Sequence, residues 1–554
     1  MFDLLLRGGM VVDGLGTPAF RADVAVQGGR IAAVGDLGQA EAERTLDCAG
    51  HCISPGWVDI HGHADGNVLE HPLGLNLLVQ GCTATVAGNC GSSVAPLVGQ
   101  AAALLKRGAG GRRGASTNAM LQRHPEGAWD MGAFLDAVDG GGLGVNYVQL
   151  VGHNALRQAV MGNDPRPATE AEVAQMVTLL EAALDQGALG LSSGLVFIPG
   201  CWATTEEVIA LAKVVGRRGG VYASHIRGER ETNIEATQEF IRIAEEGRVR
   251  AQMSHMQSKW PVYGNAVAKM EMLEQAMARG VALAVDSETF PNWASTAARF
   301  LQIYQYTPEQ LVTLMGSPAG RQQLKQTMRT VHPWHPLGKF GPGGVAYRRA
   351  WDRILIYDCP HDRSLEGKTV GQVAAARGIE FEDALFDLTV AEKGKGPRLI
   401  YDYIEDDHYR TAPWKYCTFP SIDTGLFDPA TALSELDLRC WRDTGYPGTI
   451  GLAPRVLGQF VREERLLSLE EAIRKMTSLS MQQMGVYNRG VIRPGLWADL
   501  TVFDPQTVAL RHPNADPARL ETFFSPGIPY VIVNGVVTME GGRHTGARAG
   551  RVLR

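Results

Sequence analysis

The middle of this 554-residue chain alternates strand-like runs with helical patterns, and this alternation constrains the fold more than any other feature. The strand-like runs are CISPGWVDI, TATVAG, NYVQLVG, ALGLSSG, GVYASH, RAQMSH and VALAVD. Helical patterns lie between several of them. Two of these helices open with a capping box, in which Thr169 pairs with Glu172 and Thr204 pairs with Glu207. Strand–helix units repeated over this length favour a parallel sheet and predict an α/β fold, the closed (β/α)8 TIM barrel.

The two ends of the chain have a different pattern. Short alternating strands separated by glycine turns occur at the start, as in DLLLRGGMVVDG, and at the end, as in PYVIVNGVVTMEGG. Such alternation with GG or NG turns is typical of β-hairpins. We therefore predict one small β-sandwich domain built from residues 1–54 plus 488–554, next to a barrel of residues 55–487.

The strand–helix rhythm breaks between residues 297 and 410. Proline, arginine and tryptophan accumulate there, as in TVHPWHPLGKFGPGG, and the pattern offers one helix, at Thr369–Arg377. We interpret residues 297–410 as an insertion late in the barrel.

Charge and composition exclude several classes of partner. The net charge is -6, and 20% of the residues are charged, so we expect no nucleic acid and no acidic membrane as partner. The apolar run at the start is too short for a signal peptide, and no stretch approaches a membrane span. Eight scattered cysteines without a CxxC pair suggest reduced thiols, so we expect a cytoplasmic protein. The sequence is compatible with a homo-oligomer.

Candidate metal ligands stand where the predicted barrel strands end, which is where active-site residues of this fold lie. The candidates are His61, His63, Cys90, His225, His255 and Asp423. Each has an ordinary explanation when taken alone. A lone histidine is more often a structural residue, and a lone cysteine such as Cys90 is most often a small buried residue. A nucleophile is an alternative for Cys90, and the scattered cysteines argue against a disulfide. His61 and His63 share one side of an extended chain, because the side-chain period of a strand is two residues. Four histidines, one cysteine and one aspartate at the same ends of predicted strands together predict a metal site.

The segments around these residues resemble the amidohydrolase superfamily and, within it, the N-acyl-D-amino-acid deacylases, also called D-aminoacylases. PGWVDIHGHAD is similar to the family's Pro-Gly-x-x-Asp-x-His-x-His-x-Asp run, and QGCTATVAGNCGSSVAP is similar to its Gln-Gly-x-Thr-x-x-x-x-Gly-Asn-Cys-Gly segment. Further blocks follow in the family's order: VGHNALR, GALGLSSGLVFIPG, YASHIRGE, PRVLGQFVRE and RGVIRPGLWADLTVFDP. The resemblance covers nearly the whole chain. It implies a metal-dependent TIM barrel with a β-sandwich from both termini and a late insertion.

The resemblance also implies the site and its chemistry. It assigns a tight Zn2+ position to Cys90, His225 and His255. It assigns a second, weaker metal position to His61, His63 and Asp423, with the Cys90 thiolate as the bridge. Thiolate and imidazole suit zinc, and three protein ligands leave room for a water. Metal-activated water would attack the amide carbonyl, while Asp423 would accept the proton of the water and return one to the departing nitrogen.

The residues that should hold the substrate depart from the family pattern. Family members grip the α-carboxylate of N-acyl-D-amino acids with a lysine and an arginine, where this chain has Gln257 and Gly448. Our candidate substrate-binding residues are Gln257, Lys259, Trp293, Arg157 and Phe197, the last replacing a family tyrosine. Either other cations hold the carboxylate, such as Lys259, Arg157, Arg348 or Arg349, or the substrate has no free carboxylate there. We favour the second interpretation, which predicts an altered substrate specificity.

Other functions need other residues. Cyclic-amide hydrolases of the dihydroorotase or hydantoinase type usually bridge two metals with a carboxylated lysine on the fourth strand, and ALGLSSG contains none. A deaminase of the superfamily would lack Cys90. A catalytically silent binding protein on this fold should have lost metal ligands, whereas all six candidates are present. We therefore expect a metal-dependent hydrolase of a small-molecule amide.

Overall fold

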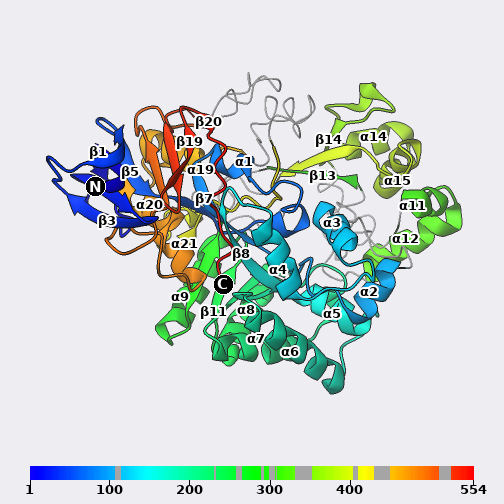
Figure 1. Cartoon of the computed structure of the whole chain (residues 1–554). Helices are drawn as coiled ribbons and strands as arrows, with labels where there is room; N and C mark the ends of the chain where they lie inside the picture. The colour runs from blue at the N-terminus through cyan, green and yellow to red at the C-terminus, as the bar shows by residue number, and fades with distance from the viewer. Residues whose placement is uncertain are drawn as a thin grey trace.

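The computed structural model describes residues 1–106, 114–229, 232–256, 265–287, 292–297, 306, 308–330, 352, 354–402, 410–428, 450–510 and 526–554. Its strands form three sheets: an eight-stranded parallel sheet, a nine-stranded sheet from both ends of the chain, and a three-stranded sheet. In Figure 1 the blue N-terminal and red C-terminal strands lie together, and the yellow-green three-stranded sheet lies at the opposite side of the view. None of the described helices is long and apolar enough to cross a membrane.

The eight-stranded sheet is the barrel that the sequence predicts. Its strands, in spatial order, are β6 (Trp57–Asp59), β7 (Cys82–Ala87), β8 (Asn146–Gly152), β9 (Gly190–Gly194), β10 (Val221–His225), β11 (Arg250–Met253), β12 (Leu283–Asp286) and β16 (Cys417–Thr418). Neighbouring strands are parallel throughout. The segment after β16 returns to the segment after β6, because Ile60 N–H donates to Pro420 O and Asp423 N–H donates to His61 O. The segments that follow the first and the last strand are therefore hydrogen-bonded to each other, and the carboxyl ends of the parallel strands lie at the same edge of the sheet.

Helices follow most of these strands and bury apolar faces against them. The helices before the insertion are α1 (Leu75–Leu78), α2 (Gly99–Lys106), α3 (Ala115–Arg123), α4 (Met131–Gly140), α5 (His153–Met161), α6 (Glu170–Asp185), α7 (Thr205–Arg217), α8 (Asn233–Gly247) and α9 (Ala266–Ala278). Short 3-10 turns are η1 (Ala64–Gly66) and η2 (Gly200–Trp202). After β16 come α19 (Leu452–Arg455), the π-helical η4 (Val456–Glu463), α20 (Leu469–Met476) and α21 (Ser478–Gln483).

The two predicted capping boxes differ in the structure. At α6 the box is complete: the Thr169 hydroxyl accepts from Glu172 N–H, and the Glu172 carboxylate accepts from Thr169 N–H. At α7 the Thr204 hydroxyl accepts from Glu207 N–H, but the Glu207 side chain turns into the core instead of back to residue 204. The second half of that prediction is therefore wrong, because buried partners compete for the carboxylate.

The nine-stranded sheet combines the two ends of the chain. Its strands are β1 (Phe2–Val11), β2 (Phe20–Gln27), β3 (Arg30–Gly35), β4 (Ala42–Asp47), β5 (Cys52–Pro55), β17 (Leu500–Phe503), β18 (Tyr530–Val533), β19 (Val536–Glu540) and β20 (Arg543–His544). The join is the antiparallel pair of β5 and β17. Side chains from both ends, such as Leu6, Val24, Leu500 and Ile532, fill one core cluster. This agrees with the predicted β domain, whereas its exact boundaries at residues 54 and 488 stay a prediction.

The third sheet lies between β12 and β16 in the chain, late in the barrel. It consists of β13 (Asn292–Thr296), β14 (Ile354–Asp358) and β15 (Arg398–Asp402), all antiparallel. Its helices are α11 (Pro308–Met315), α12 (Pro318–Thr330), η3 (Arg363–Leu365), α14 (Val370–Arg377) and α15 (Phe381–Ala391). The predicted helix is confirmed as α14, capped by Thr369, but the expectation of one helix is wrong. The additional helices bury a core of their own, which includes Ile356, Val373, Phe386 and Leu399.

Candidate metal centre

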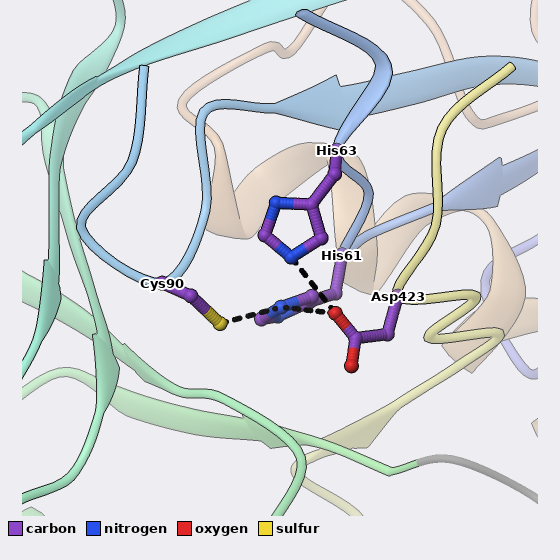
Figure 2. Close-up of side chains that lie close together, drawn as sticks. All are labelled: His61, His63, Cys90 and Asp423. Carbon is purple, nitrogen blue, oxygen red and sulfur yellow. Dashed lines mark hydrogen bonds and ion pairs between the residues drawn. The ribbon is translucent and has the colours of Figure 1, made fainter. Parts of the chain in front are cut away.

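Six of the predicted residues meet at the ends of the barrel strands. His61 and His63 follow β6, Cys90 follows β7, His225 ends β10, His255 follows β11 and Asp423 follows β16. Their potential ligand atoms form two groups, each with all atoms within 4.8 Å of one another. The first group is His61, His63, Cys90 and Asp423 (Figure 2), and the second is Cys90, His225 and His255. Cys90 is the residue that the groups share.

The Cys90 sulfur lies at the centre of three imidazoles. Its Sγ is 3.3 Å from His61 Nε2, 3.7 Å from His225 Nδ1 and 3.6 Å from His255 Nε2. Sulfur and imidazole nitrogen are the donors that zinc prefers in proteins. The chemistry of the second group, Cys90, His225 and His255, therefore fits a zinc ion, and the first group is a second candidate position that shares the same sulfur.

Asp423 completes the second group. Its Oδ1 is 2.9 Å from His63 Nε2 and 3.6 Å from His61 Nε2, contacts that Figure 2 shows as dashed lines. Its side chain is only 9% exposed. A carboxylate in this place contacts two of the candidate ligand imidazoles and is positioned to exchange protons with a group bound between them.

Burial and charge shift the pKa values in this cluster in opposite directions. Burial alone would raise the pKa of the Cys90 thiol, but the imidazoles of His61, His225 and His255 lower it well below its usual value. Burial likewise opposes the charged form of His63, yet the hydrogen bond to Asp423 raises its pKa to about 10. Burial would raise the pKa of Asp423 as well, and His63 more than offsets it, so that the pKa is lowered. The site thus favours a thiolate at Cys90 and a carboxylate at Asp423, the forms that bind metals, whereas His63 must lose its proton to bind one.

Three candidate ligands have a backbone conformation that non-glycine residues seldom adopt. The φ angles are 51° for Cys90, 33° for His255 and 50° for Asp423. Within the described part of the chain, four other non-glycine residues have a positive φ. Such conformations cost free energy and gather at functional sites, where the surrounding structure holds them.

Glycines on both sides of Cys90 allow neighbouring backbone to come close. A Cβ on Gly88 would lie 2.2 Å from the Leu150 carbonyl oxygen, and one on Gly91 would lie 2.5 Å from the Gly194 nitrogen. The Gly91 N–H also donates to the Ser192 hydroxyl at 3.0 Å. The loop that carries Cys90 is thus pressed against β8 and β9, which fixes where the sulfur points.

Carboxylates behind the imidazoles were not predicted as site residues. Asp286, at the end of β12, accepts a hydrogen bond from His255 N–H at 2.7 Å, and its Oδ1 is 3.6 Å from His61 Nδ1. Asp59 accepts from Thr85 and from Ile422 N–H, and burial raises its pKa to about 6 despite these bonds. Asp59 stands in the same short motif as His61, which is the only sequence signal that points to it.

A third carboxylate, Glu229, faces the two histidines of the second group. Its oxygens are 3.2 Å from His225 Nε2 and 3.2 Å from His255 Nδ1. Glu229 follows His225 by four residues, in the run YASHIRGE. That spacing lies in a loop, so no periodicity of helix or strand could have indicated the contact.

The structure describes the side chains of only two of the five candidate substrate residues, Phe197 and Arg157. Phe197 lies at the site: its ring is half-buried and packs edge-on against His225, with ring centroids 4.8 Å apart. Gln257 and Lys259, like Arg348, Arg349 and Gly448, lie outside the described residues, and only the backbone of Trp293 is described, in β13.

Arg157 is placed differently from the expectation that it holds substrate. It is fully buried, its guanidinium donates to the Glu207 carboxylate and to Arg166 O, and Glu207 also contacts His153. A guanidinium that is fully buried and paired with a carboxylate of the fold is poorly placed to bind a carboxylate of the substrate. This position argues against the proposed role of Arg157.

Comparisons with known proteins agree with this geometry. The model of the amidohydrolase family matches residues 423–539. A D-aminoacylase of Alcaligenes xylosoxydans xylosoxydans is 33% identical, over 100% of this chain and 97% of that protein. The chain belongs to the N-acyl-D-amino-acid deacylase family. This confirms the resemblance read from the motifs, and with it an amidohydrolase, an enzyme that acts on amide C–N bonds.

Solved structures of the N-acyl-D-amino-acid deacylase family have the same fold. An N-acyl-D-glutamate deacylase from Bordetella bronchiseptica, complexed with zinc and a phosphonate that mimics the tetrahedral intermediate, matches with a TM-score of 0.72 and 30% identity, over 100% of this chain and 99% of that one. A D-aminoacylase described as having a binuclear metal center, with one-metal activation and second-metal attenuation, also matches with a TM-score of 0.72 and 30% identity, over 100% of both chains. The predicted TIM barrel with its added β domain is thereby confirmed.

Proposed function

We propose that this chain is a zinc-dependent amidohydrolase in which Cys90, His225 and His255 hold one tight Zn2+. The observation that carries the proposal is one thiol within 3.7 Å of three imidazoles, at the mouth of a barrel of this family. His61, His63 and Asp423 are proposed to surround a second and weaker metal position, with the Cys90 thiolate between the two. The binuclear center described for a solved D-aminoacylase supports this arrangement.

Bound zinc would supply a water of lowered pKa and a Lewis acid for the carbonyl oxygen. Asp423 is the proton carrier in this proposal. As a carboxylate it is ionised at neutral pH and can accept a proton. The hydrogen bond from His63 holds it in place, and it then protonates the departing nitrogen, since an amine leaves poorly as an anion. The products are a carboxylic acid and an amine.

We propose a small-molecule amide substrate that has no free α-carboxylate at the place where family members grip one. Gln257 and Gly448 stand where the family has its lysine and arginine. The burial of Arg157 and its pairing with Glu207 support this proposal over one in which Arg157 holds the carboxylate. An apolar wall at Phe197, where the resemblance expects a tyrosine, also favours a less polar substrate.

Cysteine chemistry supports a reducing compartment. The seven described cysteines form no disulfide, and burial is the main reason that the pKa of Cys48 and of Cys417 rises to about 12. We therefore propose a cytoplasmic location, where thiols stay reduced.

A substrate screen with metal analysis tests these proposals. The purified protein is assayed against N-acyl-D-amino acids, their L-forms and neutral cyclic amides, with Cys90→Ala as the background for contaminating hydrolases. We expect about one tightly bound zinc per chain and turnover of an amide without a free α-carboxylate. Rapid hydrolysis of simple N-acyl-D-amino acids would refute the altered specificity. A protein without zinc and without activity would refute the catalytic proposal and favour a binding protein on this fold.

A further inference from the structure

Glu229 is a buried carboxylate whose two oxygens face two different histidines. Its Oε2 is 3.2 Å from His225 Nε2, and its Oε1 is 3.2 Å from His255 Nδ1. Its side chain is 9% exposed. Glu229 is in neither group of potential ligand atoms, because it lies behind the imidazoles and not between them.

The two imidazoles present opposite nitrogens to this carboxylate and to Cys90. His225 has Nε2 toward Glu229 and Nδ1 toward the sulfur, at 3.7 Å. His255 has Nδ1 toward Glu229 and Nε2 toward the sulfur, at 3.6 Å. A neutral imidazole carries one N–H and one lone pair, and an ionised carboxylate only accepts hydrogen bonds. Both contacts are at ion-pair distance, and the contact at His225 Nε2 does not have the geometry of a hydrogen bond. A nitrogen that faces Glu229 at this distance is the one best placed to keep its proton.

We propose that Glu229 is a positioning residue that sets the tautomers of His225 and His255 and orients both rings for zinc. It holds the proton of His225 on Nε2 and that of His255 on Nδ1, so that both lone pairs point to the side where Cys90 lies. One carboxylate thus sets the tautomer and the ring orientation of two of the three residues proposed to bind the tight zinc. The inference depends on the proposed function, because a tautomer matters here only if a metal binds.

The substitution Glu229→Gln separates this role from simple packing. Glutamine has the same shape, but its NH2 group donates and only its oxygen accepts. One imidazole must then present a lone pair to the NH2 group, and its proton moves to the nitrogen that faces Cys90. Loss of such an outer carboxylate typically weakens metal binding by about 10–100-fold.

Zinc affinity and metal-free stability are measured on the full-length protein. Competition with a chromophoric chelator gives the affinity, and the thiolate-to-cobalt charge-transfer band of the Co2+ form reports the ligand geometry. We expect zinc affinity of Glu229→Gln to fall by about 10–100-fold, with an altered cobalt band and an unchanged melting temperature of the metal-free protein. Glu246→Gln is the matched control, because Glu246 is exposed on α8 and pairs with Arg242.

Each outcome decides the inference. Wild-type zinc affinity in Glu229→Gln would overturn it, and so would a loss of zinc that is accompanied by an equal loss of metal-free stability, which indicates a packing role. Failure of the unmodified protein to bind zinc would overturn the proposed function as well, so the two failures are distinguishable.

Discussion

Glu207 is buried against two basic side chains, and its replacement by glutamine should destabilise the fold while leaving the metal centre intact. Its Oε1 is 2.7 Å from His153 Nε2, and its Oε2 pairs with the Arg157 guanidinium. The side chains of Glu207 and Arg157 are 1% and 0% exposed. Glutamine would keep the shape of the side chain, and the N-cap hydrogen bond from the residue 207 backbone to Thr204 would remain. It would leave the Arg157 charge buried without its counter-ion.

The pKa of Glu207 gives the magnitude. Burial opposes the charged form, but His153 and Arg157 lower the pKa from 4.5 to about 2. A difference of this size corresponds to about 3 kcal/mol in favour of the ionised, folded form. The folded-state pKa is the lower one, so this stabilisation is complete above about pH 4.5 and disappears as the pH falls toward 2. This magnitude agrees with the loss of stability of about 3–5 kcal/mol that follows when one partner of a buried ion pair is removed in other proteins.

Urea unfolding at pH 7 and at pH 3 measures the effect. Glu207→Gln should lower the free energy of unfolding by about 3 kcal/mol at pH 7, and by less at pH 3. Zinc content of the folded variant should equal that of the unmodified protein. Glu206→Gln is the control, because the neighbouring Glu206 is 68% exposed and should have little effect. A loss below about 1 kcal/mol at pH 7, or one that does not shrink in acid, would refute the reasoning.

Further substitutions test the metal centre. Cys90→Ala should remove tightly bound zinc and hydrolysis together, by metal analysis and assay, because the tight position then has only imidazoles; full zinc with normal activity would exclude the ligand role. Asp423→Asn should retain zinc but lose about 10²–10⁴-fold in turnover, and near-normal turnover would count against a proton carrier. Gly88→Ala places a Cβ 2.2 Å from the Leu150 oxygen at φ +80°, so both the melting temperature and the zinc content should fall, and unchanged values would contradict the contact.

The sequence was informative about the barrel and the ligands for a physical reason. Parallel strands share one direction, so residues at the carboxyl ends of successive strands meet at one mouth whatever lies between them. Cys90 and His255 are far apart in the chain, yet their places at strand ends predicted that they lie in one site, and the structure has the Cys90 sulfur 3.6 Å from His255 Nε2. The family resemblance rested on the same segments and is confirmed over the whole chain.

The sequence-based predictions failed or stayed open where a side chain contacts residues that are distant in the sequence. Glu207 matched a capping box, but His153 and Arg157 lie close enough to capture its carboxylate. The same contact places Arg157 in the core, which argues against a role in substrate binding. In the insertion, helices α11, α12 and α15 were missed because their apolar faces pack on one another and on a three-stranded sheet, not on a regular barrel.

The sequence by itself thus determined the fold class, the family and the set of potential metal ligands, because these depend on local periodicity and on the order of short motifs. Only the tertiary structure decided how the ligands are held. It placed the Glu229 carboxylate behind His225 and His255, and Asp286 behind His61. It also placed three ligands in left-handed backbone conformations. These features depend on loop paths and on contacts across the barrel, where no periodic pattern records which side chain a carboxylate will face.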